Sequence, residues 1–239
     1  MAAVEVGAPE ALAERFAAIF EEAVRDALAA RGRCAVALPG GSVAQAFFPR
    51  LVSVPADWPR LHCFFVDERA VPLGSPDSNA GLARRLWLDH VPVDPAHVHP
   101  LHRPGLELEQ AARDAERELV SLLGASPRLD LVLLGVGADG HVASLFPGRP
   151  ELHEERLVLA VRDAPKPPAA RLTLGPAALR AARQLCIAAF GAEKAAAVEQ
   201  AVEAPDSALP VSLVARASPR VRFLLDHAAA ARLSRPPAP

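Results

Sequence analysis

The chain has 239 residues, 51% of them apolar, and its 26 basic and 28 acidic side chains give a formal net charge of −2. This length and apolar content suit a single α/β domain over residues 1–239 with a substantial core. The near balance of charge excludes a broad basic surface for nucleic acid or an anionic membrane, so an anionic ligand needs a local pocket.

Helical and short apolar segments alternate along the chain. Apolar residues recur at helical spacing over 9–31, and a buried strand follows at 34–38. We expect the tail over 233–239 to fray. Between these, the patterns predict helices at 43–52, 79–90 (capped by Ser78), 106–123, 176–182 and 193–201, and strands at 61–66, 129–134, 156–161, 171–174, 184–190 and 220–224.

Strands that are apolar throughout and separated by helices indicate a mainly parallel sheet with helices on both faces. In such sheets, ligands bind beyond the carboxyl ends of the strands. The polar or Gly-rich clusters at 39–42, 67–69 and 135–141 all follow predicted strands. We therefore expect them to meet at one edge of the sheet.

No segment predicts export or membrane insertion. The N-terminus lacks a basic region followed by an apolar stretch, and no run of about 18 apolar residues occurs. Cys34, Cys63 and Cys186 lie in separate apolar runs without the spacing of a metal site, which indicates buried, reduced thiols. We expect a cytoplasmic protein with no nucleic-acid or membrane partner.

Gly40, Gly41 and Ser42 follow the predicted strand at 34–38. Two glycines let the backbone turn tightly, and the helix start behind them offers free N–H groups and a positive dipole end, which suit a phosphate. An ordinary strand-to-helix turn capped by Ser42 explains the same residues.

Charged side chains in three other segments are also candidates for the site. Asp67 and Arg69 belong either to a solvated loop or to a crevice where they meet sugar hydroxyls and an anion. Lys166 lies on the stiff Pro-rich loop at 164–168, and Arg171 begins a strand. Lys194 lies at a helix N-terminus, where the dipole disfavours a cation unless an anion shares the site; a solvated lysine is the alternative.

The segment from 135 to 148 contains a formal GxGxxG after a strand, with Asp163 downstream as a ribose partner. We reject dinucleotide binding, because Pro147 and Pro150 leave no room for the crossover helix. The better interpretation is a tight loop that presents His141 as a base, with Asp139 nearby. A structural histidine that bonds loop carbonyls is the alternative.

Five segments in order resemble the 6-phosphogluconolactonase family: LPGGS, FFVDERAVPLGSPDSN, LVLLGVGADGHVASLFPG, APKPPAARLTL and GAEKA. The match spans nearly the whole chain. Val43 and Val142 stand where a threonine is common in the family. The resemblance implies a Rossmann-like fold shared with glucosamine-6-phosphate deaminase and ribose-5-phosphate isomerase.

The resemblance also implies hydrolysis of 6-phospho-D-glucono-1,5-lactone in the oxidative pentose phosphate pathway. His141 matches the family's general base, with Asp67 or Asp139 as its partner. Asp67 and Arg69 match the segment that lines the site.

For the phosphate, the family's binding region matches Gly40, Gly41 and Ser42, with Lys166, Arg171 and Lys194 as cationic candidates. We expect no metal and no cofactor, and a monomer or weak homodimer.

Two other functions stay open at this stage. The sister activity, glucosamine-6-phosphate deaminase or a related isomerase, would use a carboxylate such as Asp67 as the base. A non-catalytic sugar-phosphate sensor would bind without turnover, although the chain has no spare length for a DNA-binding segment.

Overall fold

A seven-stranded parallel sheet forms the centre of the molecule, in the order β1-β10-β9-β6-β2-β3-β5. The structure is a computed structural model that describes residues 2–234. The strands are β1 Ala3–Val6, β2 Cys34–Leu38, β3 Leu61–Phe65, β4 Asp67–Arg69, β5 Val98–His99, β6 Leu131–Gly135, β7 Val158–Val161, β8 Arg171–Leu174, β9 Leu185–Ala189 and β10 Val221–Leu225.

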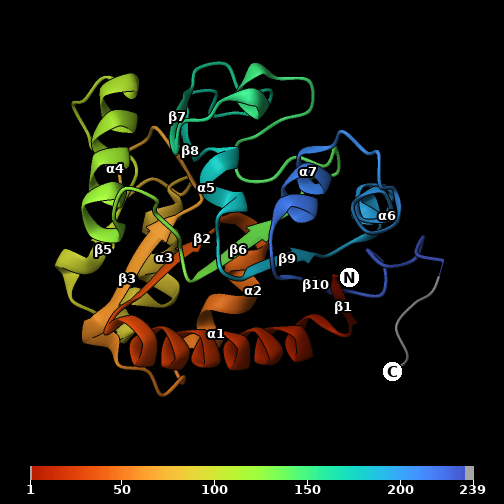
Figure 1. Ribbon diagram of the computed structural model, residues 1–239, viewed down its shortest axis with the longest axis horizontal. Helices are drawn as coiled ribbons and strands as arrows, with labels where there is room; N and C mark the ends of the chain where they lie inside the picture. The colour runs from red at the N-terminus through yellow and green to blue at the C-terminus, as the bar shows by residue number, and fades with distance from the viewer. Residues whose placement is uncertain (1, 235–239) are drawn as a thin grey trace.

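Helices cover both faces of this sheet, as the sequence predicts. Figure 1 shows α1 below the sheet and α5 and α7 above it. The helices are α1 Pro9–Arg31, α2 Gly41–Leu51, α3 Asn79–Leu86, α4 Leu108–Leu123, α5 Pro176–Arg180, α6 Ala195–Glu203 and α7 Pro210–Ala217. Short 3₁₀ turns lie at Trp58–Arg60, Leu88–His90, Pro95–His97, Pro150–His153 and Ala192–Lys194. Among the described residues, no helix is both long and apolar enough to cross a membrane.

The predicted helix at 9–31 and strand at 34–38 are confirmed to the residue. The predicted helix at 79–90 ends earlier, at Leu86, and Ser78 caps it by accepting a hydrogen bond from the Gly81 N–H at 3.0 Å. The predicted start at residue 193 is a 3₁₀ turn, with α6 beginning at Ala195.

Aromatic side chains fill the layer between α1, α2 and the sheet. Phe16 and Phe47 are fully buried and stack with their ring centres 5.1 Å apart, and Phe20 meets Trp87 edge to face at 5.6 Å. Burial of each such side chain contributes roughly 1.5–3 kcal/mol to stability. Cys34, Cys63 and Cys186 are buried free thiols, as expected.

A second, three-stranded antiparallel sheet, in the order β4-β8-β7, was not predicted. Residues 67–69 are therefore a strand, where we expected a loop. β4 follows β3 almost directly, and the Leu174 N–H donates to the Val66 carbonyl at 2.8 Å, which ties β8 to the end of β3. This sheet brings Arg171 opposite Arg69 in the register.

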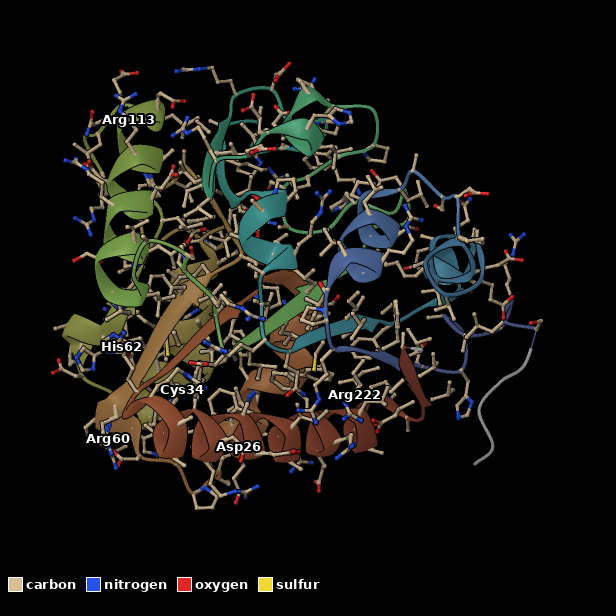
Figure 2. The ribbon with its side chains drawn as sticks, viewed as in Figure 1. Asp26, Cys34, Arg60, His62, Arg113 and Arg222 are labelled. Atoms are coloured by element: carbon tan, nitrogen blue, oxygen red, sulfur yellow. The ribbon has the colours of Figure 1, made fainter. Side chains whose placement is uncertain are left out.

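β1 forms one edge of the main sheet and was also missed. Its Glu5 carboxylate pairs with Arg222 of β10 and with Arg15 of α1, the latter at 2.7 Å. Figure 2 labels Arg222, which lies above the N-terminal end of α1. At the other terminus, the expected fraying of 233–239 does not extend to the first two of these residues. Leu233 packs on the core and the Ser234 N–H donates to Glu203 at 2.8 Å, while 235–239 lie outside the described residues.

Candidate active site

A cleft of about 170 Å³ opens where β2, β3, β6 and β9 end. From β2 the chain continues to β3 on one side, whereas β6 pairs with the other side of β2. The strand order therefore reverses between β2 and β6, and α/β sheets bind ligands at such a reversal. The predicted convergence on one edge is therefore confirmed. Of the candidate residues, all except Asp139 line the cleft: Gly40, Gly41, Ser42, Asp67, Arg69, His141, Lys166, Arg171 and Lys194.

A tight loop after β6 presents His141. The Gly140 N–H donates to the Gly137 carbonyl and the Gly137 N–H donates to the His141 carbonyl, both at 2.9 Å. His141 Nδ1 lies 2.5 Å from Asp139 Oδ1. Because an ionised carboxylate only accepts, the ring carries its proton on Nδ1 and keeps a lone pair on Nε2. Asp139, rather than Asp67, is thus the hydrogen-bond partner of His141.

The surroundings of His141 and Asp139 favour the protonation states that a general base and its partner need. Burial lowers the pKa of His141 and Lys166 lowers it further, which outweighs the opposite effects of Asp139 and Asp67. Burial raises the pKa of Asp139, but the hydrogen bonds from His141 and the nearby charge of Lys166 outweigh it, so the net pKa is lowered. His141 is therefore neutral and Asp139 ionised at neutral pH.

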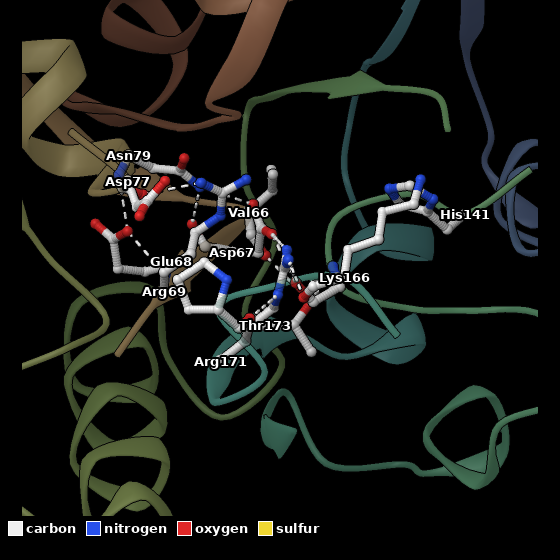
Figure 3. A network of polar contacts seen from close by, with 12 residues as sticks. Val66, Asp67, Glu68, Arg69, Asp77, Asn79, His141, Lys166, Arg171 and Thr173 are labelled. Carbon is white, nitrogen blue, oxygen red and sulfur yellow. Dashed lines mark hydrogen bonds and ion pairs between the residues drawn. The ribbon is translucent and has the colours of Figure 1, made fainter. Parts of the chain in front are cut away.

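Asp67 is buried at the start of β4, with 6% of its surface exposed. Its Oδ1 accepts from Asn79 Nδ2 at 3.0 Å and its Oδ2 from Ser144 Oγ at 2.7 Å, while Arg171 Nη1 lies 3.9 Å away (Figure 3). Both oxygens are thus held by protein groups. This arrangement suits a carboxylate that fixes its neighbours.

Asn79 is a site residue that our sequence reasoning did not select. Its amide donates to both the backbone and the side chain of Asp67, and its Oδ1 lies only 1.7 Å from where a Cβ on Gly40 would be. Gly40 is therefore required because Asn79 occupies the space of a side chain. The trailing Asp77-Ser78-Asn79 segment of the family resemblance carried the signal for it.

The other half of the cleft offers groups for an anion. Gly41 and Ser42 are exposed as the first two residues of α2, so their backbone N–H groups have no partner within the helix. Ser42 is not the cap of this helix; Gly40 occupies that position, with no side-chain cap bond. Lys194 also lines the cleft; 21% of its side chain is exposed, and its ammonium lies 3.7 Å from the Glu193 carboxylate.

Three comparisons place the chain among known proteins. The family model described as glucosamine-6-phosphate isomerases/6-phosphogluconolactonase matches residues 7–223. The chain belongs to this family. It is 39% identical to a 6-phosphogluconolactonase of Streptomyces coelicolor, over 96% of this chain and 94% of that one, and 39% identical to one of Rattus norvegicus, over 86% and 83%.

Solved structures show the same fold. A 6-phosphogluconolactonase of Trypanosoma brucei superposes with a TM-score of 0.84 at 29% identity, over 98% of this chain and 99% of that one. A monomeric glucosamine-6-phosphate deaminase superposes with a TM-score of 0.81 at 20% identity, a level that supports the fold alone, over 96% and 99%. The predicted α/β fold class is confirmed.

Proposed function

We propose that this protein hydrolyses 6-phospho-D-glucono-1,5-lactone to 6-phospho-D-gluconate, the lactonase step of the oxidative pentose phosphate pathway. The observation that carries the proposal is the neutral His141, oriented by Asp139, in a cleft that also holds a helix N-terminus and lysines. The relatives named 6-phosphogluconolactonase, at 39% identity over most of the chain, support the same substrate.

In the proposed mechanism, His141 Nε2 accepts a proton from a water molecule as that water attacks the lactone carbonyl carbon. The carbonyl oxygen becomes an oxyanion, which cations in the cleft stabilise. The tetrahedral intermediate then expels the ring oxygen, which takes the proton from His141. The ring opens to the hydroxy acid and the imidazole returns to its neutral state.

We propose two cations, Lys166 and Arg69, as the groups that stabilise the oxyanion. The Lys166 side chain extends toward His141 (Figure 3), and it is close enough to lower the pKa of the imidazole. Arg69 also lines the cleft, where its Nη1 donates to the Asp77 carbonyl at 2.9 Å. We assign the reacting end of the substrate to these two residues.

We assign the phosphate to Gly41, Ser42 and Lys194. The backbone N–H groups of Gly41 and Ser42 have no partner within the first turn of α2, and Lys194 of the same cleft adds a positive charge. We do not assign proton transfer to Asp67, because both of its oxygens accept hydrogen bonds from protein groups. Metal-free chemistry, a cytoplasmic location and a monomer or weak homodimer stay predictions.

The test uses the purified chain with freshly generated 6-phosphogluconolactone and, in parallel, glucosamine 6-phosphate. We expect acid release from the lactone far above the spontaneous rate, and no ammonia from the amino sugar. Ammonia release would instead support the deaminase activity of the family. Binding of either sugar phosphate without turnover would indicate a sensor and contradict the proposal.

Gly137→Ala tests whether the loop geometry sets the position of the base. A Cβ at this residue would lie 1.9 Å from His141 Nδ1 and 2.5 Å from Asp139 Oδ1, so the imidazole has to move. A misplacement of about 1 Å costs up to about 10²-fold in rate, and we expect a kcat loss approaching that. Gly74→Ala is the matched control, because no atom lies within 4 Å of its Cβ position. Equal activity of the two variants would contradict this account.

A further inference from the structure

Arg171 is a buried cation at the base of the cleft, with 4% of its surface exposed. Its Nε donates to the Pro168 carbonyl at 2.9 Å, and its Nη2 donates to the carbonyls of Lys166 and Pro167 at 2.8 and 3.3 Å. The guanidinium thus bonds three successive carbonyls of one loop. Such a rigid fork of donors can hold a loop in one shape.

The remaining nitrogen of Arg171, Nη1, faces Ser144 and Asp67. Nη1 lies 3.5 Å from Ser144 Oγ and 3.9 Å from Asp67 Oδ2. Every nitrogen of this guanidinium therefore faces an oxygen of the protein. Lys194, which also lines the cleft, has 21% of its side chain exposed and its ammonium 3.7 Å from a single carboxylate oxygen of Glu193.

Ser144 continues these contacts to the loop of the base. It is 1% exposed and follows His141 by three residues. Its hydroxyl donates to Asp67 Oδ2 at 2.7 Å, and its N–H donates to Thr173 Oγ1 in β8 at 3.2 Å. The loop that carries His141 and the loop that carries Lys166 are therefore connected through Asp67, Ser144 and Arg171.

We propose that Arg171 is a positioning residue that holds the 166–168 loop so that the Lys166 ammonium faces His141, and that it does not bind the substrate's phosphate. This proposal rests on the proposed function in one respect: the role of Lys166 in stabilising the oxyanion. In Figure 3, Arg171 lies beneath the backbone of Lys166, whose side chain reaches away from it toward the imidazole. The phosphate then depends on Lys194 and the start of α2.

Arg171→Lys is the decisive variant, because it keeps the charge and removes the fork that bonds three carbonyls. Since Lys166 lowers the pKa of His141, release of its loop raises that pKa. NMR titration of the His141 ring measures this pKa without turnover. The result therefore tests the role of Arg171 even if the lactone is not the substrate. We expect an upward shift in Arg171→Lys, the same direction in Lys166→Met, and no further shift in the double variant.

Catalysis and phosphate binding supply the second readout. We expect Arg171→Lys to lower kcat about tenfold or more through the displaced Lys166, with the affinity for inorganic phosphate unchanged. Lys194→Met weakens phosphate binding and leaves the His141 pKa unchanged. If the buried ammonium of Arg171→Lys prevents folding, Arg171→Gln removes the same three-carbonyl fork without burying a charge; the same pKa shift is expected.

Two results would overturn the proposal. One is phosphate binding weakened by Arg171→Lys as much as by Lys194→Met, since that makes Arg171 a direct ligand. The other is an unchanged His141 pKa, or a shift that persists when Lys166 is already methionine, since either shows that Arg171 does not act through Lys166.

Discussion

His141→Asn lowers kcat for lactone hydrolysis by about 10²- to 10⁴-fold, the usual contribution of a general base. KM changes little, because the residues that we assign to the phosphate are unchanged in this variant. Asparagine can still donate to Asp139, so the loop keeps its bonds while the basic Nε2 is lost. The measurement is steady-state kinetics with the spontaneous hydrolysis of the lactone subtracted.

The pH profile of the unmodified enzyme reports the same group. The base has to be neutral, and its pKa lies below the ordinary 6.5 because of burial and Lys166. We therefore expect kcat/KM to hold constant at neutral pH and to fall with acid only below about pH 6.5. His153→Asn, at an exposed histidine, is the control and keeps full activity. A His141→Asn variant with near-normal kcat would rule out the assignment of the base.

The composition of the cleft could be predicted because its residues follow apolar strands. Parallel strands place their carboxyl ends at one edge, so Gly40, Asp67 and His141 had to meet there once the strands were recognised. The role of each residue, as a ligand contact or as a support for a loop, could not be predicted. Whether a buried guanidinium contacts a ligand or a loop depends on side-chain packing, and no spacing rule encodes the three carbonyls that Arg171 bonds.

The elements that the sequence did not reveal are short or polar. β4 carries the charged Asp-Glu-Arg segment, and its pairing with β8 is across more than a hundred residues, so tertiary contacts override its low strand propensity. β5 has two residues and gives no periodicity. The helix at Pro210–Ala217 begins with proline without a polar cap, and its Val211 N–H donates to the Gly140 carbonyl of the His141 loop at 3.1 Å.

Acid destabilises this fold through a second histidine site, remote from the cleft. His62 in β3 is 8% exposed, and its Nδ1 lies 3.0 Å from Nε2 of His99, whose Nδ1 lies 2.6 Å from Glu118. Only one proton fits between the two facing nitrogens. Burial, and then the charges of His97, His99 and Arg33, lower the pKa of His62 from 6.5 to about 4, with Asp94 opposing.

The pKa of His62 is 6.5 in the unfolded chain and about 4 in the folded chain, so the unfolded chain takes up the proton first as pH falls. The contribution of this group to the free energy of unfolding is therefore complete above pH 6.5 and is lost as pH falls toward 4. The expected loss from this group between pH 7 and pH 4.5 is about 2 kcal/mol. Urea unfolding at several pH values measures it, and His62→Gln, whose amide can still donate to His99, flattens the slope. His153→Gln leaves the slope unchanged. Equal slopes in the unmodified chain and His62→Gln would show that His62 carries no such proton linkage.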